Sequence, residues 1–134
     1  TYAGAKGGLG ALDPVKQAKD SLAQAIKVDP AALDGSAFTS LGALYYQVPG
    51  WPVGFGDDEQ AEVLLKKALT MNPDGIDPNY FYGDYLAREK RYSEAKVVLE
   101  KALAAADRPG REVADEGRRA EAKALLAKVQ SELD

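Results

Sequence analysis

Residues 79–102 of the chain read NYFYGDYLAREKRYSEAKVVLEKA and contain the patterns of two successive helices. The first helix pattern carries large residues together with one glycine, Gly83. The second alternates small alanines with large apolar residues at spacings of three and four, which is typical of an amphipathic helix. Residues 38–73 repeat this order, so a helix pair occurs twice. The matching positions are Phe38, Leu41, Gly42, Tyr45, Ala61, Leu65 and Ala68, and then Asn79, Tyr82, Gly83, Leu86, Ala95, Leu99 and Ala102.

The distance between the copies gives the length of the repeating unit. Ala68 and Ala102 are 34 positions apart. Ala25, in a half copy that precedes both, lies 43 positions before Ala68. The nine extra residues divide into seven inserted in the segment 47–58 and two around Asp34. The half copy covers residues 13–30 and is marked by Ala18, Leu22, Ala25 and Pro30.

The composition excludes several functional classes. The 134 residues are 46% hydrophobic, which is enough for one domain with its own core. The chain has no His and no Cys, which removes imidazole and thiolate zinc sites, disulfides and the usual nucleophile pairs. A formal charge of −4 argues against a nucleic-acid partner, and no apolar run reaches the roughly 18 residues of a membrane span. We expect no catalytic residue, no metal, no cofactor and no membrane insertion.

Start and stop signals along the chain predict six helices. Asp13-Pro14 is typical of a helix start, and Asp34-Gly35-Ser36 offers caps for the second helix. Asp57 and Asp58 place negative charge where a third helix begins. Pro and Gly separate the later segments. The predicted ranges are 15–28, 36–47, 57–71, 78–90, 93–106 and 112–133.

The order of these residues resembles the tetratricopeptide repeat (TPR), a helix pair of 34 residues. The resemblance implies an all-α fold, a short right-handed TPR-type helical solenoid of antiparallel helix pairs with a C-terminal capping helix. A single TPR-like domain would span residues 1–134. Its parts would be the half repeat 13–30, a repeat over 35–73 with the insert 47–58, a repeat over 76–107 and the capping helix 111–133.

Three longer segments resemble a bacterial subgroup of TPR proteins. They read YYQVPGWPVGFGDDEQAEVLLKKAL, NPDGIDPNYFYGDYL and RPGREVADEGRRAEAKALL. The subgroup contains small, often exported proteins that resemble the TatT component of TRAP-type solute transporters. This resemblance favours a periplasmic or exported protein over a cytoplasmic one.

Gly42 and Gly83 lie inside helices, where glycine costs about 1 kcal/mol relative to alanine. We expect each glycine to mark a close crossing with the following helix, whose small partners would be Ala61, Ala68, Ala95 and Ala102. The last helix resembles a terminal capping helix, whose polar outer face is exposed to solvent, as is usual at the ends of repeat proteins. Its predicted buried face consists of Ala122, Leu125, Leu126, Val129 and Leu133.

The insert 47–58 contains the only Trp of the chain, Trp51, together with Phe55, two prolines and three glycines. Two interpretations are open. The loop is pinned by its aromatic residues onto the interface between repeats, or it forms a wall or lid over the groove, since such insertions map to one edge of a solenoid.

A polar and aromatic stripe is formed by Tyr80, Asp84 and Arg88, which follow at steps of four along one helix. The equivalent stripe one repeat earlier is Thr39, Ala43 and Gln47, with Tyr46 alongside. The TPR resemblance places this stripe in the groove, where we expect exposed tyrosines to serve as anchors. An ordinary solvated helix face is the alternative.

The remaining charged residues are predicted to be structural. Asn72, Asp74 and Asp77 match turn and cap positions. Asp115, Arg118 and Glu121 follow at steps of three, which predicts ion pairs within one helix.

The TPR resemblance implies a non-enzymatic scaffold that binds a protein or peptide on its concave face, with a homo-oligomer possible because two and a half repeats make a shallow groove. The alternative is an exported transporter-accessory or small-ligand-binding protein whose pocket is closed by Trp51 and Phe55. The predicted partner-binding residues are Thr39, Tyr46, Gln47, Trp51, Phe55, Tyr80, Asp84 and Arg88.

Overall fold

The computed structural model describes residues 8–50 and 52–134, and this part of the chain is built from helices. The predicted all-α fold is confirmed, since six α-helices follow one another and the described residues add no more to them than a short 3₁₀ turn and an isolated bridge between Gly50 and Gly56. The elements are α2 (Gly8–Val28), η1 (Ala32–Gly35), α3 (Ser36–Gln47), α4 (Asp58–Met71), α5 (Ile76–Arg88), α6 (Tyr92–Ala104) and α7 (Glu112–Leu133).

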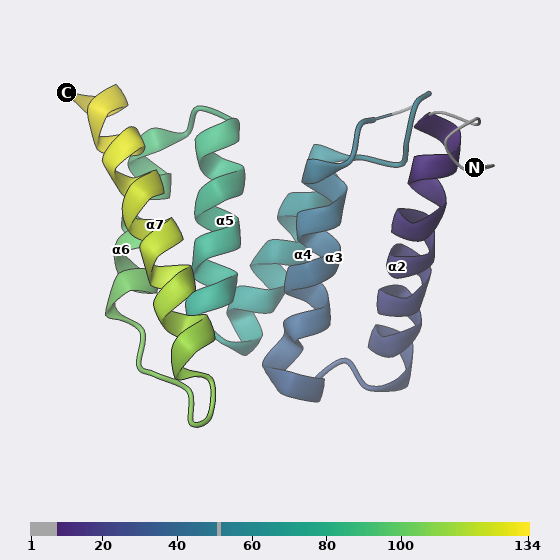
Figure 1. Ribbon diagram of the computed structural model, residues 1–134, viewed down its shortest axis with the longest axis horizontal. Helices are drawn as coiled ribbons and strands as arrows, with labels where there is room; N and C mark the ends of the chain where they lie inside the picture. Colours follow the sequence, from purple (N-terminus) through teal and green to yellow (C-terminus); the bar gives the residue numbers. More distant parts are fainter. Residues whose placement is uncertain (1–7, 51) are drawn as a thin grey trace.

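Helices that are neighbours in the sequence pack side by side in antiparallel pairs. Figure 1 shows α3, α5 and α7 on the near side of the molecule, with α4 and α6 behind them. The α3 helix also contacts α5, and α5 contacts α7. These three helices therefore form one continuous surface, called here the α3–α5–α7 face.

The helix boundaries agree with the sequence prediction to within two residues, except at the start of the first helix. The predicted range 36–47 is that of α3, and α7 begins and ends as predicted. The α2 helix begins at Gly8 rather than at Asp13-Pro14, so Pro14 lies inside it. Proline in a helix interior removes one backbone hydrogen bond and disfavours the helix, yet α2 continues through Pro14. The predicted start of the first helix was therefore wrong.

The predicted N-terminal cap is confirmed for α4 and wrong for α3. The Asp57 carboxylate accepts a hydrogen bond from the Gln60 backbone N–H at 3.1 Å, which confirms the cap of α4. The predicted cap of α3 is wrong, because its N-cap position is Gly35, which has no side chain to accept a bond. Leu33, Asp34 and Gly35 all have positive φ values instead, at 51°, 56° and 81°. The two extra residues in this region are thus absorbed by a left-handed turn.

The close crossings predicted at Gly42 and Gly83 are confirmed. A Cβ added at Gly42 would lie 2.8 Å from Cγ of Leu65, and one added at Gly83 would lie 2.6 Å from Cδ2 of Leu99. Real Cβ atoms do not approach other atoms this closely, so each glycine allows its helix to pack against a leucine of the next one. The predicted alanine partners of these crossings are buried, at 0–1% exposure: Ala61, Ala68, Ala95 and Ala102.

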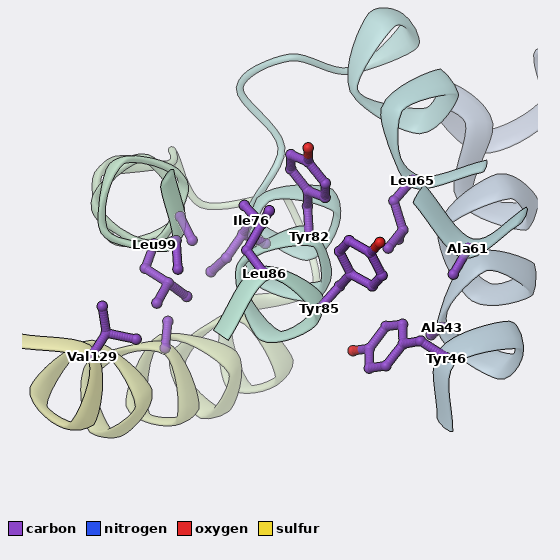
Figure 2. Packing of buried hydrophobic residues seen from close by; sticks show 13 residues of the cluster. Ala43, Tyr46, Ala61, Leu65, Ile76, Tyr82, Tyr85, Leu86, Leu99 and Val129 are labelled. Atoms are coloured by element: carbon purple, nitrogen blue, oxygen red, sulfur yellow. The ribbon is translucent and has the colours of Figure 1, made fainter. Parts of the chain in front are cut away.

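The main core lies between the helix pairs, and Figure 2 shows its central side chains. Leu86 of α5, Leu99 of α6 and Val129 of α7 are almost completely buried and meet within it. Tyr82 is also buried, as predicted from its match to Leu41. A second cluster at the α3–α4 pair takes Leu22 and Ile26 of α2 onto its edge, and its buried members are Phe38, Leu41, Leu64 and Ala68.

A polar cluster on Glu62 joins α4 to α5 and to the start of α6, and no motif of the sequence predicted it. The Tyr82 hydroxyl donates to Glu62 at 2.8 Å, and Arg91 forms an ion pair with the same carboxylate at 2.9 Å. Burial alone would raise the pKa of Glu62, but the hydrogen bonds from Tyr82 and Arg91 outweigh it and lower the pKa. Burial raises the pKa of the neighbouring Tyr85 to about 12.

The α7 helix packs on α5 and α6 through part of its predicted face. Ala122 and Val129 are buried, whereas Leu133 is 40% exposed, so the prediction for Leu133 was wrong. Leu133 is the last helical residue, and it lies beyond the core cluster that Leu125 and Leu126 still contact.

Candidate functional site on the α3–α5–α7 face

The predicted stripe comes together where α3 meets α5. The Tyr46 hydroxyl donates a hydrogen bond to Asp84 at 2.7 Å, and Arg88 forms an ion pair with the same carboxylate at 3.3 Å. The Arg88 guanidinium also lies 5.1 Å from the centre of the Tyr46 ring, within the range of a cation–π contact. Gln47 donates to the Tyr46 hydroxyl at 3.5 Å. Four of the predicted residues therefore form one connected polar group.

Tyr46 itself is buried, which corrects the expectation of an exposed anchor. It is 9% exposed and packs edge-on against Tyr85, with 5.8 Å between the ring centres. Burial and the hydrogen bond to Asp84 raise the pKa of Tyr46 far above its ordinary value. Tyr46 therefore supports Asp84 and Arg88 from the buried side, and Arg88 and Gln47 are the exposed members of the group.

Thr39 and Tyr80 occupy the other half of the face. Thr39 is 4% exposed, so it too is more buried than predicted. Tyr80 is partly buried beside Phe81, and the Arg118 guanidinium of α7 lies 5.1 Å and 4.7 Å from the centres of these two rings. Arg118 thus extends the stripe from α5 onto α7.

Phe55 of the insert lies away from this stripe, next to α2. Phe55 packs edge-on against Tyr45 at 5.6 Å between ring centres, and the Lys19 ammonium of α2 lies 5.2 Å from the Phe55 ring. The structure therefore places Phe55 at the α2–α3 edge, in agreement with the pinned-loop interpretation. The prediction for Trp51 lies outside the described residues.

An open groove of about 570 Å³ lies between α5 and α7, beside the Tyr46 group. This volume lies within the range of ordinary ligand pockets. Its apolar lining comes from Ala87, Tyr92, Leu125 and Val129, and charged side chains surround it. The charged residues of the groove are Asp84, Arg88, Lys128 and Glu132.

The sequence prediction missed the α7 side of this groove because it treated the outer surface of α7 as a solvating cap. The spacing of two glycines in the sequence could have indicated that α7 continues the repeat. Gly117 lies 34 positions after Gly83, so the unit length that relates the two repeats continues into α7. By the same spacing, Ala114 corresponds to Tyr80. Leu125, about three turns after Ala114, lines the groove beside α5.

A smaller cavity of about 200 Å³ lies at the other end of the face, among the first turns of α3, α5 and α7. Asp77 forms ion pairs there with Arg118 at 3.0 Å and with Arg108 at 3.5 Å. Asp77 therefore joins α5 to α7, in addition to lying in the first turn where it was predicted as a cap residue. Because both arginines are paired with carboxylates, this cavity is a structural ion-pair cluster.

The predicted ion pairs of α7 are correct in part. Arg118 pairs with Glu121 at 2.9 Å, as predicted. Asp115 instead accepts hydrogen bonds from the Arg108 backbone N–H and from its Nε, each at 2.8 Å. Asp115 is completely buried, and the hydrogen bonds from Arg108 lower the pKa of its carboxyl below the ordinary value.

Replacing Tyr46 by phenylalanine tests the role of its hydroxyl. The ring packing would remain, and one hydrogen bond to a carboxylate would be lost. We expect the free energy of unfolding to fall by about 1–2 kcal/mol, as measured by urea denaturation. Tyr80→Phe is the matched control, because no hydrogen bond of the Tyr80 hydroxyl contributes to this group. A loss no larger than that of Tyr80→Phe would contradict the supporting role of Tyr46.

Comparison with known protein families matches residues 54–115 to the family described as tetratricopeptide repeat. The matched segment runs from the end of the insert loop to the first turn of α7. Together with the antiparallel helix pairs, the match identifies a TPR domain over residues 54–115, somewhat less than half of the chain, and TPR domains generally serve as protein-interaction scaffolds. The match is to the repeat and not to the TatT-like subgroup.

Comparison with curated proteins finds no match. In the described part of the chain, no helix has the length and apolar character needed to cross a membrane.

Proposed function

We propose that this protein is a non-enzymatic scaffold that binds a peptide or a segment of another protein on the α3–α5–α7 face. The observation that carries the proposal is the groove of about 570 Å³ between α5 and α7, adjoining the Tyr46, Asp84 and Arg88 group. The apolar lining offers a place for one or two side chains of a partner. The charged residues around it can fix the partner's orientation.

The supporting contacts keep this groove in one shape before a partner arrives. Asp84 is held by Tyr46 from α3 and by Arg88 one turn away on α5. Val129, in the wall of the groove, is 1% exposed and fixed in the core. A preformed site loses less conformational entropy on binding, which favours affinity.

The transporter-accessory role suggested by the TatT-like resemblance would require a pocket closed by the insert loop. Phe55 packs on Tyr45 and Lys19, while the two cavities described above are lined by other residues. These positions favour the peptide scaffold over a pocket closed by Phe55.

A pair of charge reversals on α7 tests the proposal. Peptides would first be selected from a phage-displayed random library against the wild-type protein. Lys128 lies in the groove, whereas Lys123 lies on the same helix outside it. Lys128→Glu should weaken binding of the selected peptides by about tenfold or more, equivalent to 1.4 kcal/mol. Lys123→Glu makes the same change in net charge and should leave the affinity unchanged.

Fluorescence anisotropy with labelled peptides measures both affinities. Failure to select any peptide, or equal affinity of the selected peptides for both variants, would contradict binding in this groove.

A further inference from the structure

The ion pairs of Asp77 account for the arginines of the smaller cavity, where α3 and α5 begin, but not for its other polar residues. Five further side chains in its lining can donate or accept hydrogen bonds, and no side-chain hydrogen bond or ion pair within the described residues involves them. These residues are Asp34, Ser36, Thr39, Ser40 and Asn72. Convergent polar groups in a concave site are the groups that fix the orientation of a bound molecule.

Thr39 is the residue of this group that most clearly lacks a partner. It is 4% exposed, and its hydroxyl makes no hydrogen bond with any residue that the structure describes. Buried polar groups in native proteins normally have a hydrogen-bond partner, because burial without one costs free energy. Ser36 and Ser40 of the same lining are exposed, so the cavity opens to solvent beside them. A side chain from outside can therefore enter past the two serines and supply the missing partner.

The size and the charge of the cavity limit what it can hold. Its volume of about 200 Å³ equals that of roughly six water molecules at about 30 Å³ each, which suits one side chain and is below the range of ordinary ligand pockets. Its lining contains two carboxylates, of Asp34 and Asp77, and two guanidinium groups, of Arg108 and Arg118, and so has no net charge. A charged side chain would lose its hydration there without meeting an opposite net charge. The cavity therefore suits a neutral polar side chain.

We propose that this cavity binds the carboxamide of an asparagine or glutamine in the same peptide that occupies the α5–α7 groove, so the inference rests on the proposed function. A carboxamide both donates and accepts hydrogen bonds, which matches a lining of hydroxyls, one amide and the acceptor Asp34. Its apolar stem would lie against Pro78 and Phe81. Serine and threonine are also neutral, but their short side chains keep the hydroxyl near the peptide backbone, whereas Thr39 lies inside the cavity.

The distance between the cavity and the groove sets the spacing of the two binding residues in the peptide. Both sites lie along α5, the cavity at Pro78 and Phe81 and the groove at Ala87 and Arg88. These two pairs are about eight residues apart, which is about 12 Å along a helix. An extended peptide spans about 3.3–3.6 Å per residue. The amide residue should therefore lie about three or four positions from the apolar residue that enters the groove.

The peptides selected from the random library also test this inference. They should contain asparagine or glutamine about three or four positions from an apolar residue. Thr39→Val removes the hydroxyl, nearly keeps the shape of the side chain, and should weaken their binding about three- to tenfold, the effect of one hydrogen bond. Thr70→Val is the matched control, because the Thr70 hydroxyl donates to the Lys67 carbonyl within α4 and Thr70 lines neither the groove nor the cavity. It should leave the affinity unchanged.

A second substitution, in the peptide, assigns the loss to the amide, with all affinities measured by fluorescence anisotropy. Replacing the amide residue by alanine should weaken binding to the wild-type protein more than binding to Thr39→Val, by the same three- to tenfold factor. Peptides that depend on Lys128 but lack an amide at this spacing, or that bind Thr39→Val and Thr70→Val equally well, would overturn this inference and leave the proposed function standing. Failure to select any peptide would overturn both.

Discussion

Replacing Leu99 by alanine is expected to lower the free energy of unfolding by about 2–5 kcal/mol, the range for removing a fully buried leucine. Leu99 is 0% exposed and lies where α5, α6 and α7 meet, close to Leu86 and Val129. Its side chain also contacts the α5 backbone at Gly83, so little can move in to fill the space. Urea denaturation monitored by circular dichroism measures the loss. Val97→Ala, at a 58% exposed position of the same helix, is the control and should cost far less.

The same substitution tests the close crossing at Gly83. Gly83→Ala alone should destabilise the protein, since its new Cβ would lie 2.6 Å from Leu99. In the Leu99→Ala background the space is open, and Gly83→Ala should then be neutral or stabilising. A coupling energy of about 0.5–3 kcal/mol is expected, as for residues in direct contact. Gly117→Ala, where the space is open, should stabilise by about 1 kcal/mol. Additive effects of Gly83→Ala and Leu99→Ala would contradict the crossing.

Replacing Asp115 by asparagine is expected to cost about 2–3 kcal/mol, because a buried charged acceptor of several hydrogen bonds is lost. Asp115 is completely buried at the start of α7 and binds both the backbone and the side chain of Arg108. Its negative charge also lies in the first turn of α7, where it interacts favourably with the helix dipole. Glu121→Gln, which weakens an exposed ion pair with Arg118, should cost about 1 kcal/mol or less.

The dependence of this loss on pH has a definite sign. Hydrogen bonds from Arg108 lower the pKa of Asp115 in the folded protein, so Asp115 stabilises the fold at pH values above its ordinary pKa of about 4. That contribution is lost as the pH falls through the lowered pKa. The difference in unfolding free energy between wild type and Asp115→Asn should therefore shrink below about pH 4. A difference that stays constant down to low pH would contradict the ionic role of Asp115.

The helices and their close crossings could be predicted because local residues determine them. Asp57 caps its own helix, and a glycine that recurs at the same place in two repeats indicates a close neighbour. The start of α2 could not be predicted, because Pro14 is compatible both with a helix start and with a helix interior. The left-handed turn at Leu33 and Asp34 depends on how α3 docks, and no rule of local sequence selects it.

The residues of the candidate site could be predicted on two separate helices, but the contacts between those helices could not. The step of four placed Asp84 and Arg88 on a common face, and they do contact each other. Whether Tyr46 points to solvent or into the α3–α5 contact depends on the rotation of one helix against another, which sequence periodicity does not specify. The ion pairs of Asp77 with Arg108 and Arg118 bridge residues far apart in the chain, so they too required the structure.

Two backbone hydrogen bonds hold the two ends of the insert loop together. The Gly56 N–H donates to the Pro49 carbonyl at 2.9 Å, and the Asp57 N–H donates to the Tyr45 carbonyl at 2.9 Å, so the two ends of the loop meet beside the last turn of α3. The α4 helix therefore begins at a point fixed by Tyr45 and Asp57, whatever the length of chain between them. This junction is suited to engineering. A foreign epitope or recognition peptide grafted there would be displayed at one edge of the solenoid while the helix pairs keep their spacing.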